Sequence, residues 1–294
     1  MIGILTKVCD ENDMITTLLA NNAGPFTGPG TQTHVFGDQD TCVVIDPGPS
    51  LPEHMEAIYS AIGHRKLCGI LLTHRHGDHA GAALTLQVNL NTSIMAFPIL
   101  PSDHYRIPEG RFYTDFDYEA IHEGDEITVG SLTLSVVHTP GHCFDHVAFV
   151  CKQTGDLFVG DTIMAWSSTA IVQPEGNMEA YRQSLRKLYH IDVQRFHPTH
   201  GDIIHDPKAR IVQLLAHRRK REEELFSRLG AEPMGLSELR KIIYPQLPEN
   251  LYAGAETSLL SHILDLNDRG IVTWSKKGVV KQENAQCDPM IWNL

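Results

Sequence analysis

The sequence predicts a mixed α/β layered fold followed by a smaller, mainly helical unit. In the first two hundred residues, short β-rich runs alternate with helical stretches, whereas helical patterns dominate after Asp206. The charge balance changes at the same place. Residues 1–205 carry 11 Lys and Arg against 24 Asp and Glu, a balance of −13, while residues 206–294 carry 13 against 12. We therefore expect two domains, residues 1–205 and residues 206–294.

Strands are expected where short apolar or alternating runs are bounded by turn residues, and helices where apolar residues recur at spacings of three and four. The expected strands of the first part are residues 14–20, 31–36, 41–46, 68–73, 126–129, 132–137, 146–151 and 157–159. The expected helices are residues 51–62, 78–88 and 178–189. Residues 97–119 are rich in proline and aromatic residues, which indicates either a loop beside a pocket or a surface connection pinned by buried rings.

The second part has the order helix, helix, helix, hairpin, which resembles a winged helix. The helices are expected at residues 207–229, 236–243 and 256–268, and the hairpin strands at residues 271–274 and 279–281. On the first of these helices, Arg218 and Glu222 begin a series of opposite charges at i,i+4 spacing. That series predicts a solvated, self-paired face, with a nucleic-acid contact as the alternative.

Composition and charge limit the classes of function. With 42% hydrophobic residues, a net charge of −12 and six scattered cysteines, the chain is expected to be a globular protein with reduced thiols. Its first residues lack the apolar core of a secretory signal, and no apolar run is long enough for a bilayer. We expect a cytoplasmic location without a membrane partner. The acidity disfavours a protein whose main task is to grip phosphate backbones.

The strongest local signal is the run His74-Arg75-His76-Gly77-Asp78-His79, placed where an expected strand ends and a helix begins. It offers four potential metal ligands within six residues. Neutral imidazole suits Zn, Fe and related ions, and two histidines one residue apart can converge on one ion when the backbone is not a regular strand. Asp78 and His79 would then face a second ion.

Three further residues complete a candidate ligand set. They are His142 after Gly141, Asp161 after Gly160, and His200 before Gly201. Each follows an apolar or strand-like run and borders a glycine, which places a side chain on a loop at the end of a strand. Each signal alone is typical of an ordinary turn, so its value lies in the set.

The His-x-His-x-Asp-His run, the later Gly-His, the strand-terminal Gly-Asp and the final His-Gly resemble the metallo-beta-lactamase superfamily over the first two hundred residues. The resemblance implies a four-layer αβ/βα sandwich with two metal ions at one edge. It also implies the ligands of each ion: His74, His76 and His142 for one, Asp78, His79 and His200 for the other, and Asp161 as a bridge.

Residues 22–31 (NAGPFTGPGT) and the winged tail are similar to the beta-lactamase-like-protein-2 branch of that superfamily. The branch includes an animal single-strand endoribonuclease, bacterial hydrolases and fungal thioesterase-like partners of polyketide synthases. Two positions depart from its pattern: Thr199 replaces a common glycine before the last histidine, and Cys143 replaces a common threonine after His142. Neither departure removes a ligand, so an intact centre is expected.

The ligand set implies a hydrolytic mechanism with two Zn²⁺ ions per chain, for which iron or manganese are the alternatives. Two such ions lower the pKa of a shared water from ~15.7 towards ~7 and so supply a bridging hydroxide as nucleophile. Asp78 is expected to orient that nucleophile and shuttle its proton. His146 is a candidate donor to the leaving group, with an exposed histidine or one that supports a ligand as the alternative.

Several functions remain in competition at this point. The first is hydrolysis of a small ester, thioester or lactone, and the second is single-strand-specific endoribonuclease activity on single-stranded RNA. A third is a DNA-binding regulator with a metal sensor site, although the expected helix 256–268 presents mainly acidic side chains. Beta-lactamase activity is expected only as a side reaction, and the tail is expected to shape the substrate path or to form a homodimer contact.

Overall fold

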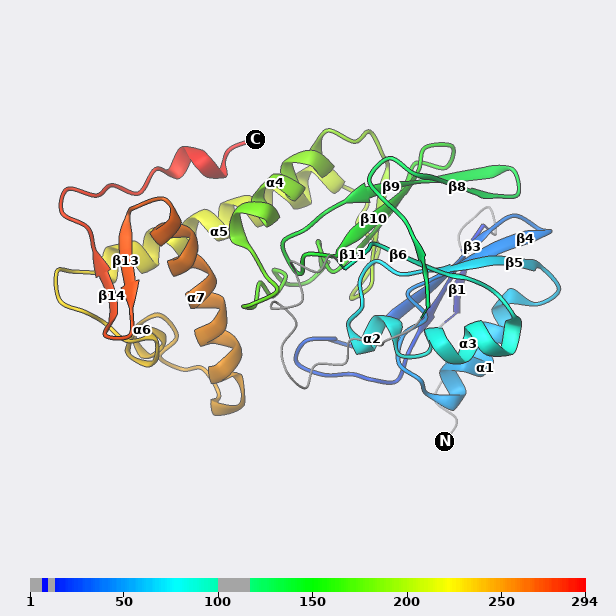
Figure 1. Ribbon diagram of the computed structural model, residues 1–294, viewed down its shortest axis with the longest axis horizontal. Helices are drawn as coiled ribbons and strands as arrows, with labels where there is room; N and C mark the ends of the chain where they lie inside the picture. Colours follow the sequence, from blue (N-terminus) through cyan, green and yellow to red (C-terminus); the bar gives the residue numbers. More distant parts are fainter. Residues whose placement is uncertain (1–6, 10–13, 100–116) are drawn as a thin grey trace.

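The computed structural model describes residues 7–9, 14–99 and 117–294 (Figure 1). The first sheet has seven strands, and their order in the sheet is the same as their order in the chain. They are β1 (Lys7–Cys9), β2 (Ile15–Leu19), β3 (Gln32–Gly37), β4 (Thr41–Ile45), β5 (Lys66–Leu71), β6 (Ile94–Ala96) and β7 (Glu119–Ala120). Pairing is antiparallel from β1 to β4 and parallel from β4 to β7. The carboxyl ends of the parallel strands therefore lie at one edge.

A second sheet of five strands faces the first. Its order is β12 (Arg195–Pro198), β11 (Asp156–Gly160), β10 (Val147–Cys151), β9 (Leu132–His138) and β8 (Glu126–Val129). Only the β11–β12 pair is parallel. A separate hairpin near the C-terminus consists of β13 (Val272–Ser275) and β14 (Gly278–Lys281).

The helices cover the outer faces of the two sheets and build the C-terminal unit (Figure 1). They are α1 (Pro52–Ile62), α2 (Gly77–Ala80), α3 (Ala83–Leu90), α4 (Met178–Tyr189), α5 (Pro207–Arg228), α6 (Leu236–Ile243) and α7 (Tyr252–Asp268), with short 3₁₀ turns at Glu249–Leu251 and Pro289–Trp292. Figure 1 shows the C-terminal hairpin, α6 and α7 beside the sandwich, with α5 leading into them.

Apolar side chains from both sheets fill the middle of the sandwich, where Phe36 and Leu71 of the first sheet join Phe149 and Phe158 of the second. A second cluster packs α1 and α3 on the outer face of the first sheet, and a third packs α4 and α5 on the outer face of the second. These layers confirm the predicted four-layer αβ/βα order.

The predicted helix 78–88 is wrong in one respect, because the structure divides it into α2 and α3. The N–H of Ala82 donates to the carbonyl of Gly48 (2.9 Å) instead of continuing the helix, and a Cβ on Gly81 would lie 2.5 Å from the carbonyl oxygen of Gly77. The break seats the second half of the histidine run against the loop that follows β4. Strands β1, β6, β7 and β12 were not predicted; each has at most four residues, too few for a periodic pattern to be recognised.

Two expectations for the C-terminal unit are also corrected. Helix α7 begins at Tyr252, one turn before the predicted start. The charged face of α5 is not a solvated, self-paired face throughout, because Arg218 and Glu222 are buried. Arg218 donates to the carbonyl of Thr169 in the sandwich, and Glu222 accepts from Trp292 Nε1 at 3.1 Å. The contact of Arg218 ties the C-terminal unit to the sandwich.

The predicted boundary at residue 206 stays a prediction, since α5 contributes side chains to the cluster against the second sheet and to a fourth cluster shared with α6, α7 and the hairpin. Most of the proline-rich segment 97–119 lies outside the described residues. Among the described helices, none combines the length and apolar character that crossing a bilayer requires.

Candidate metal centre

The seven predicted ligands lie on segments that follow four strands. His74 and His76 lie between β5 and α2, Asp78 and His79 lie in α2, His142 follows β9, Asp161 follows β11, and His200 follows β12. The two sheets present these strand ends at the same edge of the sandwich. Residues up to 126 positions apart in the chain are thus held by a rigid scaffold, as the sequence interpretation expected.

A glycine before Asp161 is required by the local backbone. Gly160 has a φ of +50°, a conformation that side chains with a Cβ rarely adopt. A Cβ there would lie 2.6 Å from His146 Nε2 and 2.7 Å from Thr73 Oγ1. The Gly-Asp dipeptide therefore allows β11 to end in direct contact with the segments that carry the other ligands.

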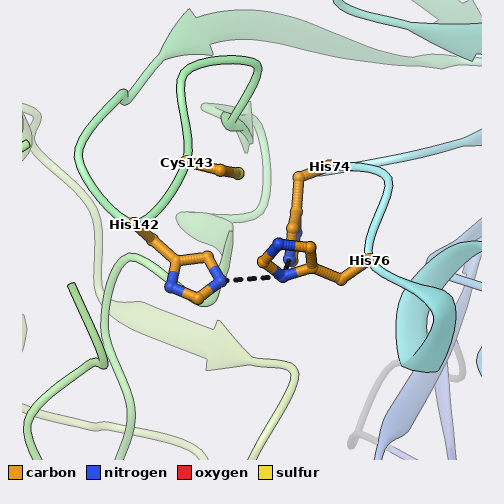
Figure 2. A group of neighbouring side chains, drawn as sticks. All are labelled: His74, His76, His142 and Cys143. Atoms are coloured by element: carbon orange, nitrogen blue, oxygen red, sulfur yellow. Dashed lines mark hydrogen bonds between the residues drawn. The ribbon is translucent and has the colours of Figure 1, made fainter. Parts of the chain in front are cut away.

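The first half of the centre consists of His74, His76 and His142, whose rings face one another (Figure 2). His76 Nδ1 lies 2.9 Å from His74 Nε2 and 3.0 Å from His142 Nε2. Three imidazole nitrogens from two loops thus point to a common place. Such a cluster of nitrogen donors is typical of a transition-metal site.

The second half consists of Asp78, His79 and His200. Asp78 Oδ2 lies 3.4 Å from His200 Nε2 and 3.8 Å from His79 Nε2. Asp161 lies between the halves: its Oδ1 is 3.5 Å from His79 Nε2 and 3.4 Å from His200 Nε2, and its Oδ2 is 3.7 Å from His142 Nε2. One carboxylate therefore faces ligand candidates of both halves.

The donor set fits metal ions. His79 Nε2 and Asp161 Oδ1 are buried and have no hydrogen-bond partner among the described residues. An unpaired buried polar atom is costly, and two that face each other without a bond are unusual. A cation held between them would satisfy both atoms, and the distances between the candidate ligand atoms, within 4.8 Å in each group, suit this role.

The pKa shifts of the candidate ligands are also compatible with metal binding. Burial, followed by the neighbouring histidines, holds the pKa of His74 well below its ordinary value, and burial lowers the pKa of His142 to about 4. Both rings are therefore neutral at pH 7, as metal ligation requires. Around His79, burial is outweighed by the charges of Asp161, Asp78 and Asp46, which raise its pKa well above the ordinary value. The second half thus favours positive charge.

Sequence reasoning did not identify Asp46, a fully buried carboxylate at the end of β4. It accepts hydrogen bonds from the N–H (2.8 Å) and hydroxyl (2.6 Å) of Thr73 and from the hydroxyl of Thr199 (3.1 Å). Its Oδ2 also lies 2.8 Å from Nδ1 of His79. Like Asp161, it is an aspartate that ends an apolar strand, and that signal could have found it.

The other ligand histidines are held in the same way through their second ring nitrogen. His76 Nε2 lies 2.6 Å from Oε2 of the buried Glu175, His142 Nδ1 lies 2.7 Å from the carbonyl oxygen of Ala170, and His200 Nδ1 lies 3.2 Å from that of Gly30. These contacts fix the tautomer and the orientation of each ring. No sequence signal marks Glu175, which lies in a loop 99 residues from His76.

His146 is fully buried behind the first half. Its ring stacks on His74 with centroids 5.0 Å apart, its Nε2 accepts from the N–H of Asp161 (3.0 Å), and its Nδ1 lies 2.8 Å from the hydroxyl of Thr139. Both ring nitrogens are thus engaged inside the protein. This placement agrees with the alternative of a histidine that supports a ligand.

Cys143, one of the two departures, lies close to the three histidines of the first half (Figure 2). It is fully buried, and burial raises the pKa of its thiol well above the ordinary value. The other departure, Thr199, supplies the hydroxyl that reaches Asp46. Both substitutions are accommodated without displacing a ligand.

A cavity of about 700 Å³ opens onto the centre. Its lining includes five of the seven candidate ligands: His76, Asp78, His142, Asp161 and His200. The remaining lining residues are Phe26, Gly77, Met164, Ala170, Val172, Ala253, Gly254 and Thr257. The last three belong to α7, so the C-terminal unit forms part of the wall.

This fold and this ligand arrangement define a metallo-hydrolase. Residues 27–200 match the family described as the metallo-beta-lactamase superfamily, and residues 236–281 match the beta-lactamase associated winged helix domain. The chain belongs to the metallo-beta-lactamase superfamily and carries a C-terminal winged helix, as the sequence resemblance implied.

Among proteins of known name, the chain is similar to the Beta-lactamase-like protein 2 homolog of Drosophila melanogaster. The two are 28% identical over 290 residues, which cover 94% of this chain and 95% of the relative. It is also similar to the atrochrysone carboxyl ACP thioesterase AacuM of Aspergillus aculeatus, with 31% identity over 77% of this chain and 69% of the relative.

Among solved structures, a metallo-beta-lactamase family protein from Thermus thermophilus superposes with a TM-score of 0.78 at 19% identity. The match covers 92% of this chain and 99% of that protein, and so shows that the two proteins share the fold of the sandwich and of the C-terminal unit. A protein solved in a di-iron-bound form has a TM-score of 0.51 at 28% identity, covering 62% of this chain and 92% of that protein.

Proposed function

We propose that this chain is a binuclear metal-dependent hydrolase that cleaves a thioester, an ester or a lactone. The observation that carries the proposal is the pair of buried, unpaired atoms His79 Nε2 and Asp161 Oδ1 between two groups of ligand side chains. In the proposed assignment, His74, His76 and His142 would hold one ion, Asp78, His79 and His200 would hold the other, and Asp161, which faces both groups, would contribute to both sites.

When bound, two ions of this kind lower the pKa of a shared water and polarise the substrate carbonyl. The chain itself supplies orientation and proton transfer. The Asp78 side chain is 32% exposed, against 6% for Asp161, so Asp78 is the more accessible of the two carboxylates that line the cavity. It would accept the proton of the attacking water and return it to the leaving sulfur or oxygen.

Asp46 and Glu175 would act as positioning residues because they touch ligand rings and not the cavity. His146 is proposed to play a similar part. It accepts the N–H of Asp161 and stacks on His74, and it is absent from the described cavity lining, which supports a positioning role in preference to donation to a leaving group. We therefore assign the role of acid to Asp78.

A small molecule is favoured over RNA as the substrate. None of the described residues that line the cavity is Lys or Arg, although contacts with phosphates depend on these side chains. The thioesterase names of fungal relatives support an acyl substrate. We propose a thioester first, and cleavage of single-stranded RNA remains the alternative to be tested beside it.

Zinc is the proposed metal because imidazole and carboxylate ligands in a partly buried site that opens onto a cavity suit a catalytic zinc ion. Iron and manganese accept the same ligands, and a relative was solved with two iron ions. The proposed content is two ions per chain.

The test combines metal analysis with a substrate panel. Purified protein is stripped with a chelator, reloaded with Zn²⁺, Fe²⁺ or Mn²⁺, and assayed on acyl thioesters, esters, lactones and single-stranded RNA. We expect about two equivalents of metal per chain and thioester hydrolysis that is lost on chelation. Asp78→Ala should lower kcat by roughly a hundredfold or more.

Asp202→Ala is the matched control, because Asp202 is an exposed aspartate that is not a candidate ligand. It should retain full metal content and activity. Protein that binds less than one equivalent of any of these metals, or an Asp78→Ala variant with unchanged turnover, would contradict the proposal. Cleavage of RNA without hydrolysis of any acyl substrate would replace it with the alternative.

A further inference from the structure

The cavity beside the metal centre is built by both domains. Ala253, Gly254 and Thr257, from the first two turns of α7, form one side of it, and Phe26, Met164 and Val172 from the sandwich form another. These first turns include the one that the sequence pattern did not predict as helix. The shape of this side of the cavity therefore depends on how the C-terminal unit packs against the sandwich.

Contacts along α7 hold this wall in place. The hydroxyl of Ser261 donates to the carbonyl of Ile171 at 2.7 Å, directly beside Ala170 and Val172 in the cavity lining. One turn further, Asp265 pairs with the buried Arg182 of α4 at 3.2 Å. The first turns of α7 are thus anchored against the catalytic part, and their side chains set the shape of the cavity.

Gly254 is the unusual residue in this wall. It is the third residue of α7, where glycine is disfavoured relative to alanine because it increases the flexibility of the unfolded chain. Its φ is negative, so the backbone does not require glycine. Among the described residues, a Cβ at this position would meet only Phe26, with Cζ at 3.4 Å and Cε1 at 3.7 Å, which are ordinary contacts. An alanine would therefore fit, whereas a larger side chain would have to displace the Phe26 ring or enter the cavity that both residues line.

The chemistry of the wall indicates what occupies that space. Phe26, Met164, Ala170, Val172 and Ala253 are apolar, and the hydroxyl of Thr257 is the one polar side chain that the described lining adds to the metal ligands. The side chain of Phe26 is 60% exposed at the rim, which is unusual for a large apolar residue. A polar or charged group would lose its hydration here without gaining a partner.

We infer that Gly254 determines substrate specificity: because it has no side chain, Phe26 packs against the first turns of α7, and the cavity keeps room for an uncharged, apolar acyl group of the substrate along this wall. This inference rests on the proposed hydrolase function, since it assigns the acyl portion of the substrate to the α7 side of the cavity. Larger side chains at position 254 then shorten the acyl group that the enzyme accepts.

The experiment uses the full chain and acyl N-acetylcysteamine thioesters with acetyl, hexanoyl and decanoyl groups. Gly254→Val should lower kcat/KM for the decanoyl relative to the acetyl thioester by about tenfold or more, because a few misplaced carbon atoms in an apolar pocket produce discrimination of this size. Gly254→Ala should shift the ratio less, and its Tm should not fall, since alanine favours the helix.

Gly230→Val is the matched control. A Cβ at Gly230 would meet no atom of the described residues within 4 Å, and Gly230 is not among the described residues that line the cavity. The control should leave the ratio of decanoyl to acetyl hydrolysis as it is in the parent protein.

A binding measurement on metal-free protein separates this inference from the proposed function. Ketones in which a methylene replaces the thioester sulfur are titrated by calorimetry. The decanoyl ketone should bind at least tenfold more tightly than the acetyl ketone to the parent protein, and Gly254→Val should abolish this preference. Equal binding and turnover of decanoyl compounds by parent and Gly254→Val would overturn the inference. If no thioester is hydrolysed but the ketone preference is found, the proposed function fails and the cavity assignment stands.

Discussion

The two halves of the metal centre differ in how their ligands are supported. In the first half, separate groups hold separate rings: Glu175 contacts His76, and a backbone carbonyl contacts His142. In the second half, the single carboxylate of Asp46 contacts His79 and also binds Thr73 and Thr199, which directly precede the candidate ligands His74 and His200. The rings of His76 and His142 can therefore be perturbed separately, whereas Asp46 ties the second half into one network, which reaches His74 of the first half through the Thr73 hydroxyl.

The charged groups around the candidate ligands also differ between the two halves. Histidines of the first half are surrounded mainly by other histidines, and burial lowers the pKa of His74 and His142. The second half places His79 among three carboxylates, which raise its pKa. Positive charge is thus favoured most strongly in the second half, where we expect the supporting carboxylate to matter most.

The largest effect is expected for Asp46→Asn. Asparagine tolerates the positive φ of 48° at this position, so the backbone should be retained. The amide cannot accept all the hydrogen bonds that the carboxylate accepts, and one buried donor then faces an NH₂ group. We expect metal affinity to fall by roughly 10–100-fold and the free energy of unfolding of metal-free protein to fall by about 1–3 kcal/mol. Metal competition titration and urea denaturation measure the two quantities.

Asp38→Asn serves as the control for Asp46→Asn. Asp38, in the turn between β3 and β4, also accepts several hydrogen bonds, from the N–H groups of Asp40 (3.0 Å), Thr41 (2.8 Å) and Ser131 (3.0 Å). It contacts no candidate ligand, so its substitution should leave metal affinity unchanged. If both variants lose affinity equally, the effect of Asp46 comes from general destabilisation and the network has no special role.

A smaller and more local effect is expected for Glu175→Gln. The amide oxygen still accepts a hydrogen bond from His76, but the charge that strengthens this contact is lost. Affinity for one of the two ions should fall by about tenfold while the other is retained, because His76, the ring that Glu175 contacts, belongs to the first half. Stepwise metal titration distinguishes the two sites. Equal weakening of both steps would show that the halves are coupled.

The difference between the halves also shows what could be predicted from the sequence. His74, His76, Asp78 and His79 were identifiable because four ligands lie within six residues at a strand end. His142, Asp161 and His200 each look like an ordinary turn and were identifiable only as a set, because each follows an apolar or strand-like run and borders a glycine. The family resemblance then implied which ion each of them holds. The supports were missed because their partners are distant in sequence: Asp46 lies 153 residues from Thr199, and Glu175 lies 99 from His76.

The elements of the fold also divide into those that local sequence patterns predicted and those that depend on tertiary contacts. Strands with strong apolar patterns, such as β4 and β10, were predicted close to their observed bounds, because both faces are buried. Strand β12 has one large apolar residue, Phe196, and is a strand because it pairs with β11. The break between α2 and α3 and the early start of α7 depend on tertiary contacts that local periodicity does not contain.

The smallest effect is expected for Thr199→Val, which removes one hydrogen bond from the Asp46 network. Valine keeps the branched shape, and the backbone contact between the carbonyl of Thr199 and the N–H of Gln32 (2.7 Å) is unaffected. Asp46 retains its contacts with Thr73 and His79, so the free energy of unfolding should fall by only about 1 kcal/mol and metal affinity by less than tenfold. A loss as large as that of Asp46→Asn would mean that the Thr199 hydroxyl, and not the carboxylate, organises the second half. Thr199→Gly, which introduces the residue that the family resemblance implies at this position, gives the direct comparison.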